Sequence, residues 1–393
     1  MKILYITSAP ITTTSSANIC NIAIIKGFLA LGHDVTVLCA HSDSLVNEEI
    51  LISLGIERAS IVPIRYSRPS ITVNNNNIKS KRKISAKNVV RKIYHSFSIF
   101  DHYKILAKRL SELNVFEEYF DLMITSSDPR SVHLLGEWIQ KHKRNSYGKW
   151  MQLYGDPILL DISTQLKLPK SYIRYIEKKL IRMADKVLYV SPLTLIEQKK
   201  IYPSYSDKMH FISIPYIKEK IFDNKKIINS KIKIGYFGDY NPNIRNLKPL
   251  YDGVNKMKNL QLFLYGNSSS PFDSTTNVTV KSRVPFNELE EIEKQVDILI
   301  GVCNLKGTQV PAKLYYYAAT NKPVIFIIDG NEQNKQFLSE YITSFNRFIV
   351  CENNIESIED TIMNFEELNK TVNNSPIEKL NFINVAKEIC NIL

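Results

Sequence analysis

Short apolar runs recur along the first half of the chain, and segments with helical spacing separate them. The runs KILYIT and HDVTVLC flank a segment from about Ala17 to Leu31 that has the apolar spacing of a helix and ends at Gly32. The series continues with ASIVPIRY, DLMITSS, GKWMQLYG, DKVLYVS and HFISIPY. Because strands alternate with helices, the pattern predicts a parallel sheet with helices on both faces.

The same pattern begins again at about Lys231. Strand candidates there are KIGYFG, LQLFLYG, VTVKSRV, DILIGVC, KPVIFII and RFIVC, with helices expected near residues 247–257 and 312–319. The final segment, SPIEKLNFINVAKEICNIL, has the apolar spacing of an amphipathic helix. A chain of 393 residues is long enough for two domains of this kind.

The predicted fold class is therefore α/β, with two doubly wound parallel-sheet (Rossmann-like) domains facing a cleft. We expect an N-terminal domain over residues 1–228, a C-terminal domain over residues 229–375 and a C-terminal helix over residues 376–393. Open parallel sheets bind ligands at the loops that follow the carboxyl ends of their strands. We therefore look for functional residues in those loops and in the expected cleft.

The composition, with 44% hydrophobic and 23% charged residues, is that of a folded protein. No apolar run reaches the roughly 20 residues that a membrane span needs, and the first residues lack the features of an export signal. The five cysteines are scattered, which argues against a disulfide framework and against a zinc site. These features predict a cytoplasmic protein with reduced cysteines.

The positive charge is concentrated in the first half of the chain. Residues 1–228 contain 34 Lys and Arg against 20 Asp and Glu, whereas the remainder contains 17 against 19. Basic residues lie among apolar ones in residues 79–110, which suits an anionic membrane surface, although a solvated loop and helix is the alternative. Nucleic acid is not an expected partner, because no motif of the usual recognition modules is present.

Three loops of the first half carry candidate functional residues. Ser15 and Ser16 precede the first helix, where backbone amides could hold an anion or a sugar hydroxyl on the acceptor side, and either serine could instead be an N-cap. Asp128 follows DLMITSS and is a candidate for a substrate contact or for an N-cap. Asp156 follows MQLYG and could orient sugar hydroxyls, act as a base, or form a turn. We take Asp128 and Asp156 as the candidate catalytic residues.

The first loop also lacks the G-x-G-x-x-G fingerprint of dinucleotide binding. A nicotinamide or flavin enzyme is therefore not expected, and no cofactor is predicted.

The second half of the chain carries a different kind of candidate functional residue. Gly238 follows a strand and lets the backbone approach a ligand closely, and Arg245 stands where the next helix begins. Lys313 stands in the first turn of a helix after Pro311, where a cation opposes the helix dipole unless an anion is close. Together, Arg245 and Lys313 would make a pyrophosphate site, whereas each alone could be a solvated surface cation.

The order of these segments resembles the GT-B glycosyltransferases, and within them glycosyltransferase family 4 of bacterial polysaccharide biosynthesis. MKILYIT with GFLALGHDVTVL is similar to the start of that family's acceptor domain, and EKKLIRMADKVLYVSPLT is similar to its middle. IGYFGDYNPNIRNLKPL resembles the first strand of the donor domain with its phosphate-binding residue. The most specific match is VPAKLYYYAATNKPVI, which resembles the motif iPsKlyEYlatGkPvI.

The resemblance implies transfer of a sugar from a nucleotide sugar to a glycan or lipid-linked acceptor, with the donor bound by the second domain. Carried over by position, Arg245 and Lys313 would contact the diphosphate. The resemblance places further residues around the donor: Gly238 and Asp239 beside the sugar or phosphate, and Val310, Pro311 and Leu314 beside the nucleotide. Thr308 and Tyr316 are departures, because family members often carry glutamates there, the second of which reaches the ribose.

The sequence contains no D-x-D motif that could hold a metal-bound diphosphate. We therefore predict catalysis without a divalent ion, in which fixed cations and helix amino ends stabilise the leaving group. Two alternatives share the scaffold. One is a nucleotide-sugar epimerase or hydrolase, and the other is a catalytically inactive, membrane-associated GT-B-like binding protein.

Overall fold

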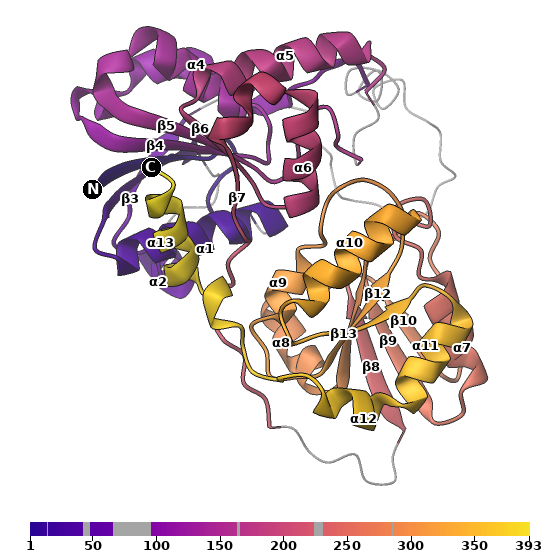
Figure 1. Cartoon of the computed structure of the whole chain (residues 1–393). Helices are drawn as coiled ribbons and strands as arrows, with labels where there is room; N and C mark the ends of the chain where they lie inside the picture. Colours follow the sequence, from indigo (N-terminus) through magenta and orange to yellow (C-terminus); the bar gives the residue numbers. More distant parts are fainter. Residues whose placement is uncertain (14, 42–47, 66–95, 163–165, 224–230, 285) are drawn as a thin grey trace, which may run out of the picture. The chain divides into compact units, whose positions relative to one another are not determined.

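The computed structural model describes residues 1–13, 15–41, 48–65, 96–162, 166–223, 231–284 and 286–393 (Figure 1). The chain divides into two compact units. Unit 1 consists of Met1–Ile212 together with Ala386–Leu393, and unit 2 consists of Ser213–Val385. Each unit is built on its own sheet and has its own core.

Unit 1 contains a seven-stranded sheet in the order β3-β2-β1-β4-β5-β6-β7, and every neighbouring pair is parallel. Its strands are β1 (Lys2–Ile6), β2 (Asp34–Ala40), β3 (Ser60–Ile64), β4 (Phe120–Ser126), β5 (Tyr147–Tyr154), β6 (Lys186–Tyr189) and β7 (Met209–Phe211). In the register, Ile3 of β1 lies between Val35 of β2 and Leu122 of β4. The strand order reverses between β1 and β4, as the doubly wound prediction requires.

Helices connect these strands: α1 (Ser16–Ala30), α2 (Glu48–Leu54), α4 (Val132–His142), α5 (Lys170–Met183) and α6 (Pro192–Ile201), with the 3₁₀ segment η1 (His102–Glu112). The predicted end of the first helix is confirmed. Gly32 has a φ of +78°, and the N–H of His33 donates to the Phe28 carbonyl at 3.0 Å. Glycine adopts this left-handed conformation without steric cost, so the helix ends here.

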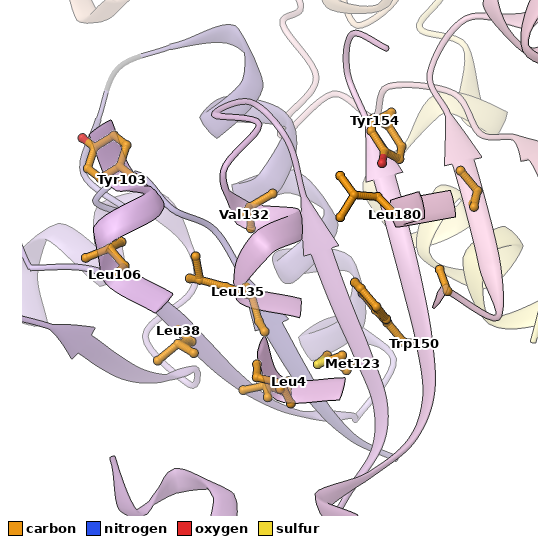
Figure 2. Close-up of a cluster of buried hydrophobic side chains, with 14 of the residues drawn as sticks. Leu4, Leu38, Tyr103, Leu106, Met123, Val132, Leu135, Trp150, Tyr154 and Leu180 are labelled. Carbon is orange, nitrogen blue, oxygen red and sulfur yellow. The ribbon is translucent and has the colours of Figure 1, made fainter. Parts of the chain in front are cut away.

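The core of unit 1 lies between the sheet and its helices, and Figure 2 shows part of it. Leu4 of β1, Met123 of β4 and Trp150 of β5 are fully buried there, together with Leu135 of α4 and Leu180 of α5. Strands covered on both faces need apolar side chains at nearly every position. This requirement explains why they appear in the sequence as continuous apolar runs.

Unit 2 contains a six-stranded parallel sheet in the order β10-β9-β8-β11-β12-β13. Its strands are β8 (Ile232–Phe237), β9 (Leu260–Tyr265), β10 (Val278–Lys281), β11 (Ile298–Val302), β12 (Val324–Ile328) and β13 (Ile349–Glu352). Its helices are α7 (Lys248–Lys256), α8 (Phe286–Lys294), α9 (Lys313–Tyr317), α10 (Glu332–Thr343), α11 (Ile355–Met363) and α12 (Phe365–Lys370). The strand order reverses between β8 and β11, so this sheet is doubly wound as well.

The division of the chain differs from the predicted boundaries at 228–229 and 375–376. Unit 2 begins at Ser213. The segment that follows already contacts the rest of unit 2, since the N–H of Lys220 donates to the Ala319 carbonyl at 2.8 Å. The C-terminal helix α13 (Phe382–Asn391) begins later than predicted, where the Asn381 side chain accepts a hydrogen bond from the Ile383 N–H at 2.9 Å. Its last residues belong to unit 1.

Across the parts of the chain that the structure describes, no helix combines the length and the apolar character needed to span a bilayer.

Candidate functional site

In unit 2, the loop that follows β8 packs closely against the loop that follows β9. Gly238 comes directly after β8, and its N–H donates to the Tyr265 carbonyl at 2.8 Å. A Cβ atom on Gly266 would overlap the Gly238 carbonyl oxygen, so the two loops can lie this close only because residue 266 is glycine. This packing fixes the backbone of Gly238 and Asp239 at the carboxyl end of the sheet.

The guanidinium group of Arg245, in the loop between β8 and α7, is held by three acceptors. Its Nη1 atom donates to the Tyr236 hydroxyl and to the Asp239 carbonyl, both at 3.3 Å, and its Nη2 atom donates to Asn304 Oδ1 at 2.9 Å. Asn304 follows β11, so these bonds join the two strands at which the strand order reverses. The Nε atom is buried and has no hydrogen-bond partner among the described residues. An unpaired buried donor is costly to the fold, so this N–H stands out among the groups of the loop.

Lys313 approaches the same loop from α9, of which it is the first residue. A Cβ atom on Gly238 would lie 2.5 Å from the Lys313 Cε atom, so the absence of a side chain at Gly238 makes room for the lysine. The ammonium lies 5.5 Å from the centre of the Tyr317 ring. Burial lowers the pKa of Lys313 to about 8; Glu293 opposes this shift, and the positive charge of Arg245 adds to it. The predicted cations therefore converge on Gly238 and its neighbour.

Two further residues beside this loop were not predicted from the sequence. Arg283, which follows β10, forms a bidentate pair with Asp239: its Nε atom lies 3.1 Å from Oδ1 and its Nη2 atom 2.6 Å from Oδ2. Asn304 orients Arg245 as described above. An arginine after an edge strand and an asparagine after an inner strand carry no signal of their own. Only the predicted strand order could have indicated that they lie near Gly238.

The other residues expected around the nucleotide lie along the segment that leads into α9. Val310, Pro311 and Leu314 are buried, and Leu314 is fully enclosed in unit 2. Tyr316 is partly exposed. A contact of these four side chains with a nucleotide stays a prediction, as does the role of Thr308 in place of a glutamate.

In unit 1, Asp128 and Asp156 lie at the carboxyl ends of the neighbouring strands β4 and β5. The two loops are tied together, because the N–H of Gly155 donates to Ser127 Oγ at 3.3 Å. Burial raises the pKa of the Asp128 carboxyl to about 7; the charge of Asp156 adds to this effect, and Arg130 opposes it. The structure thus brings the two predicted carboxyl groups close enough to interact.

A third carboxylate, that of Asp101, organises the start of α4. Asp101 Oδ1 accepts from Ser131 Oγ at 2.7 Å, and Oδ2 accepts from the Ser131 N–H at 3.1 Å. Ser131 Oγ also lies 3.3 Å from Ser8 Oγ in the loop after β1. The interpretation of Asp128 as an N-cap is wrong, because α4 begins at Val132 with Ser131 in the cap position. This leaves the Asp128 carboxyl to interact with Asp156.

Ser15 caps α1, since its side chain accepts from the Asn18 N–H at 3.1 Å. Of the two interpretations of this serine, the N-cap is therefore confirmed. Ser16 is the first residue of α1, and its contact with an acceptor stays a prediction.

Of the basic segment 79–110, residues 79–95 lie outside the described residues. In the described remainder, Lys104, Lys108 and Arg109 are exposed on η1.

Within the described ranges, no three His, Cys, Asp or Glu side chains come together as the ligands of a metal ion would. The residues at the two carboxyl ends offer hydrogen-bond donors and cations in unit 2 and neighbouring carboxyl groups in unit 1. In unit 2 these groups suit an anion, and in unit 1 they suit hydroxyl groups and proton transfer.

No family model matches the chain, and no curated protein matches it. Solved structures match it over its whole length. The crystal structure of Anabaena HepE in complex with UDP and glucose has a TM-score of 0.63 at 10% sequence identity, covering 100% of this chain and 98% of that chain. The apo form of the lipopolysaccharide outer core galactosyltransferase WaaB has a TM-score of 0.56 at 14% identity, covering 100% and 99%.

An epimerase has the same overall architecture. The UDP-GlcNAc 2-epimerase from Neisseria meningitidis, bound to UDP-GlcNAc, matches with a TM-score of 0.51 at 11% identity and covers 100% of this chain and 99% of that chain. At these identities the similarities show the fold alone. The predicted fold is confirmed: the chain has the two-domain α/β fold of the GT-B glycosyltransferases.

Proposed function

We propose that the protein is a glycosyltransferase that transfers a sugar from a nucleotide sugar to a glycan or lipid-linked acceptor. The observation that supports this proposal most is the approach of Arg245 and Lys313 to the loop of Gly238 and Asp239. Guanidinium and ammonium groups at the carboxyl end of a parallel sheet suit a diphosphate. HepE, solved with UDP and glucose, and WaaB, a galactosyltransferase, have the same fold and are consistent with this assignment.

In such a transfer, an acceptor oxygen bonds to the anomeric carbon of the donor sugar. The bond from that carbon to the diphosphate oxygen breaks, and the diphosphate leaves with the electron pair. Arg245 and Lys313 stabilise the charge that develops on it. Asp128 or Asp156 accepts the proton of the acceptor hydroxyl, and a pKa of about 7 at Asp128 suits a group that must both take up and release a proton.

The proposal includes the family and the place of action that the sequence predicts. The enzyme belongs to glycosyltransferase family 4, works in bacterial polysaccharide biosynthesis such as that of lipopolysaccharide or capsule, and acts in the cytoplasm. It contacts the inner face of the membrane through residues 79–110. It needs no divalent ion, and an assay with excess chelator checks this: turnover that vanished and returned with magnesium would contradict the metal-independent mechanism.

The experiment that tests the proposal has two steps. A panel of nucleotide sugars is screened for thermal stabilisation, since a ligand at 100 times its dissociation constant adds about 2.7 kcal/mol to the free energy of unfolding. The nucleotide sugar that stabilises the protein is then incubated with the protein, with and without candidate acceptors, and the products are analysed. We expect free nucleoside diphosphate and a new glycoside only when acceptor is present.

The second candidate is a nucleotide-sugar epimerase, favoured by the similarity in fold to the UDP-GlcNAc 2-epimerase. The same product analysis separates the two functions. An epimerase or hydrolase would change the nucleotide sugar without an acceptor, and a non-catalytic binding protein would leave it unchanged under all conditions.

A further inference from the structure

The ion pair between Asp239 and Arg283 joins the anion site of unit 2 to the loop after β10. Asp239 contacts both arginines of this region through different atoms. Its carboxylate accepts from Arg283, and its carbonyl oxygen accepts from Arg245 at 3.3 Å. Asp239 Oδ1 also accepts from the Asn267 N–H at 2.9 Å, which fixes the carboxylate against the loop after β9.

The charges around this loop do not balance. Among the described residues that contact Gly238 or Asp239, the charged side chains are Arg245, Arg283 and Lys313 with a single carboxylate, that of Asp239. Lys220 is not part of this imbalance, because it pairs with Glu293 at 2.7 Å. The site thus has a net excess of about two positive charges. The two linked phosphoryl groups of a nucleotide sugar carry about one negative charge each, so they would compensate this excess.

A carboxylate beside a phosphate site is unfavourable unless it is neutralised. Two like charges roughly 6 Å apart repel each other by about 1–3 kcal/mol at the effective dielectric constants found near a protein surface. The bidentate contact with Arg283 compensates the charge of Asp239 where an anion would otherwise be repelled. Because both partners are about half exposed, at 56% and 46%, the pair itself contributes little to the stability of the fold.

We propose that Arg283 is a positioning residue of the diphosphate site: by holding Asp239, it cancels the negative charge of this carboxylate and so permits a diphosphate to bind beside Arg245 and Lys313. The proposal rests on the proposed function in that it takes the donor's diphosphate as the natural ligand. It assigns Arg283 no direct contact with the ligand. Arg283 is instead needed only as long as Asp239 is charged.

The test uses calorimetric titration with inorganic pyrophosphate and with UDP, GDP and ADP. Arg283→Ala leaves Asp239 uncompensated, so we expect it to weaken binding about 10–100-fold, and less at high salt because exposed charges are screened. Asp239→Asn removes the carboxylate and should leave the affinity equal or higher. The double variant Arg283→Ala/Asp239→Asn should recover most of the affinity of the wild type, because no charge remains to be compensated.

The matched control is Arg109→Ala, which removes an arginine from an ion pair of similar exposure, 48% and 58%, in unit 1. It should leave binding unchanged. Unchanged binding in Arg283→Ala would contradict the proposal, and so would a double variant as weak as Arg283→Ala, which would indicate a direct contact. If the wild type binds none of the four probes, the proposed function fails together with this proposal. If the wild type binds at least one probe and only the affinities of the Arg283 variants differ from those expected, this proposal fails and the proposed function stands.

Discussion

The carboxyl ends of the two sheets have opposite electrostatic character. In unit 1, Asp101, Asp128 and Asp156 lie near one another, and the pKa of Asp128 is raised to about 7 by burial and then by Asp156. In unit 2, Arg283 and Lys313 approach the loop after β8 that also carries Arg245. The pKa of Lys313 is lowered to about 8 by burial first and then by neighbouring positive charges. Each site holds an excess of one sign of charge.

This difference runs against the overall charge of the chain. The first half of the chain carries the whole positive excess, 34 Lys and Arg against 20 Asp and Glu up to residue 228. Yet the acidic site lies in this half, at the carboxyl end of the sheet of unit 1. The comparison teaches that net charge describes surfaces and partners, whereas the chemistry of a site depends on the few charges at its strand ends. Under the proposed function, the two sites would have different tasks: proton transfer in unit 1 and compensation of phosphate charge in unit 2.

The largest expected effect comes from adding a methyl group where two loops of unit 2 are in close contact. Gly266→Ala would place a methyl group on the Gly238 carbonyl oxygen, and backbone cannot yield as a flexible side chain does. We expect a loss of about 2–4 kcal/mol in the free energy of unfolding, measured by denaturant titration, and loss of nucleoside diphosphate binding.

Gly253→Ala in α7 is the matched control, because its added Cβ would meet its nearest neighbours at 3.8 Å, an ordinary contact distance. Alanine is the better helix former, so this variant should be as stable as the wild type or more stable. Equal stability of the two variants would show that the close approach of the loops is not required.

The next effect concerns the protonation of Lys313. Its ammonium faces Arg245, Arg283, Lys220 and Glu293, and with a pKa of about 8 it loses its charge at mildly alkaline pH. The affinity for UDP, GDP or ADP should therefore fall about tenfold per pH unit above pH 8. Lys313→Arg keeps its charge, so its affinity should stay flat to pH 9.5, and a parallel fall in both proteins would exclude Lys313 as the cause.

In unit 1, the raised pKa of Asp128 predicts a pH dependence of stability. The folded state binds the proton more tightly than the unfolded state, so this contribution is complete below the ordinary pKa of 3.8 and is lost as the pH rises to about 7. The groups that face Asp128 are Asp156, Arg130 and Asp101. Asp128→Asn should flatten the fall by at least about 1 kcal/mol between pH 4 and pH 7. Identical pH profiles of unfolding would refute the assignment.

The smallest effect is expected at Asn304, which orients Arg245 without carrying charge. Asn304→Ala removes the acceptor at 2.9 Å from Arg245 Nη2, and loss of one such bond costs about 1 kcal/mol. We expect an increase of about three- to tenfold in the dissociation constant of a nucleoside diphosphate. Asn255→Ala, at the far end of α7, should have no effect on binding and serves as the control.

The fold was predictable to a large extent because parallel strands covered on both faces must be apolar throughout. Runs such as KIGYFG and DILIGVC became β8 and β11, and Gly32 ended α1 as predicted. The unit boundary was not predictable. The segment around Lys220 joins unit 2 through single backbone contacts and an ion pair with Glu293, and such contacts leave no periodic pattern in the sequence.

The residues of the candidate site likewise fall into those that could be predicted from the sequence and those that could not. The positions of Arg245 and Lys313 followed from the rule that loops at strand ends meet at one edge of a sheet. Arg283 and Asn304 come from other loops, and their importance appears only through their contacts with Asp239 and Arg245. The N-cap interpretation of Asp128 was wrong because α4 begins at Val132, after the loop that holds this carboxyl group.

The measurement that tests the central claim most directly is the affinity of UDP, GDP and ADP for the wild type, Arg245→Ala, Lys313→Ala and the double variant, with thermal unfolding to confirm that each is folded. Lys306→Ala, an exposed lysine of the loop after β11, is the control. We predict that the wild type binds at least one of the three, that each single variant binds about 10–100-fold more weakly and that the double variant does not bind. Wild-type affinity in the folded double variant would contradict the account.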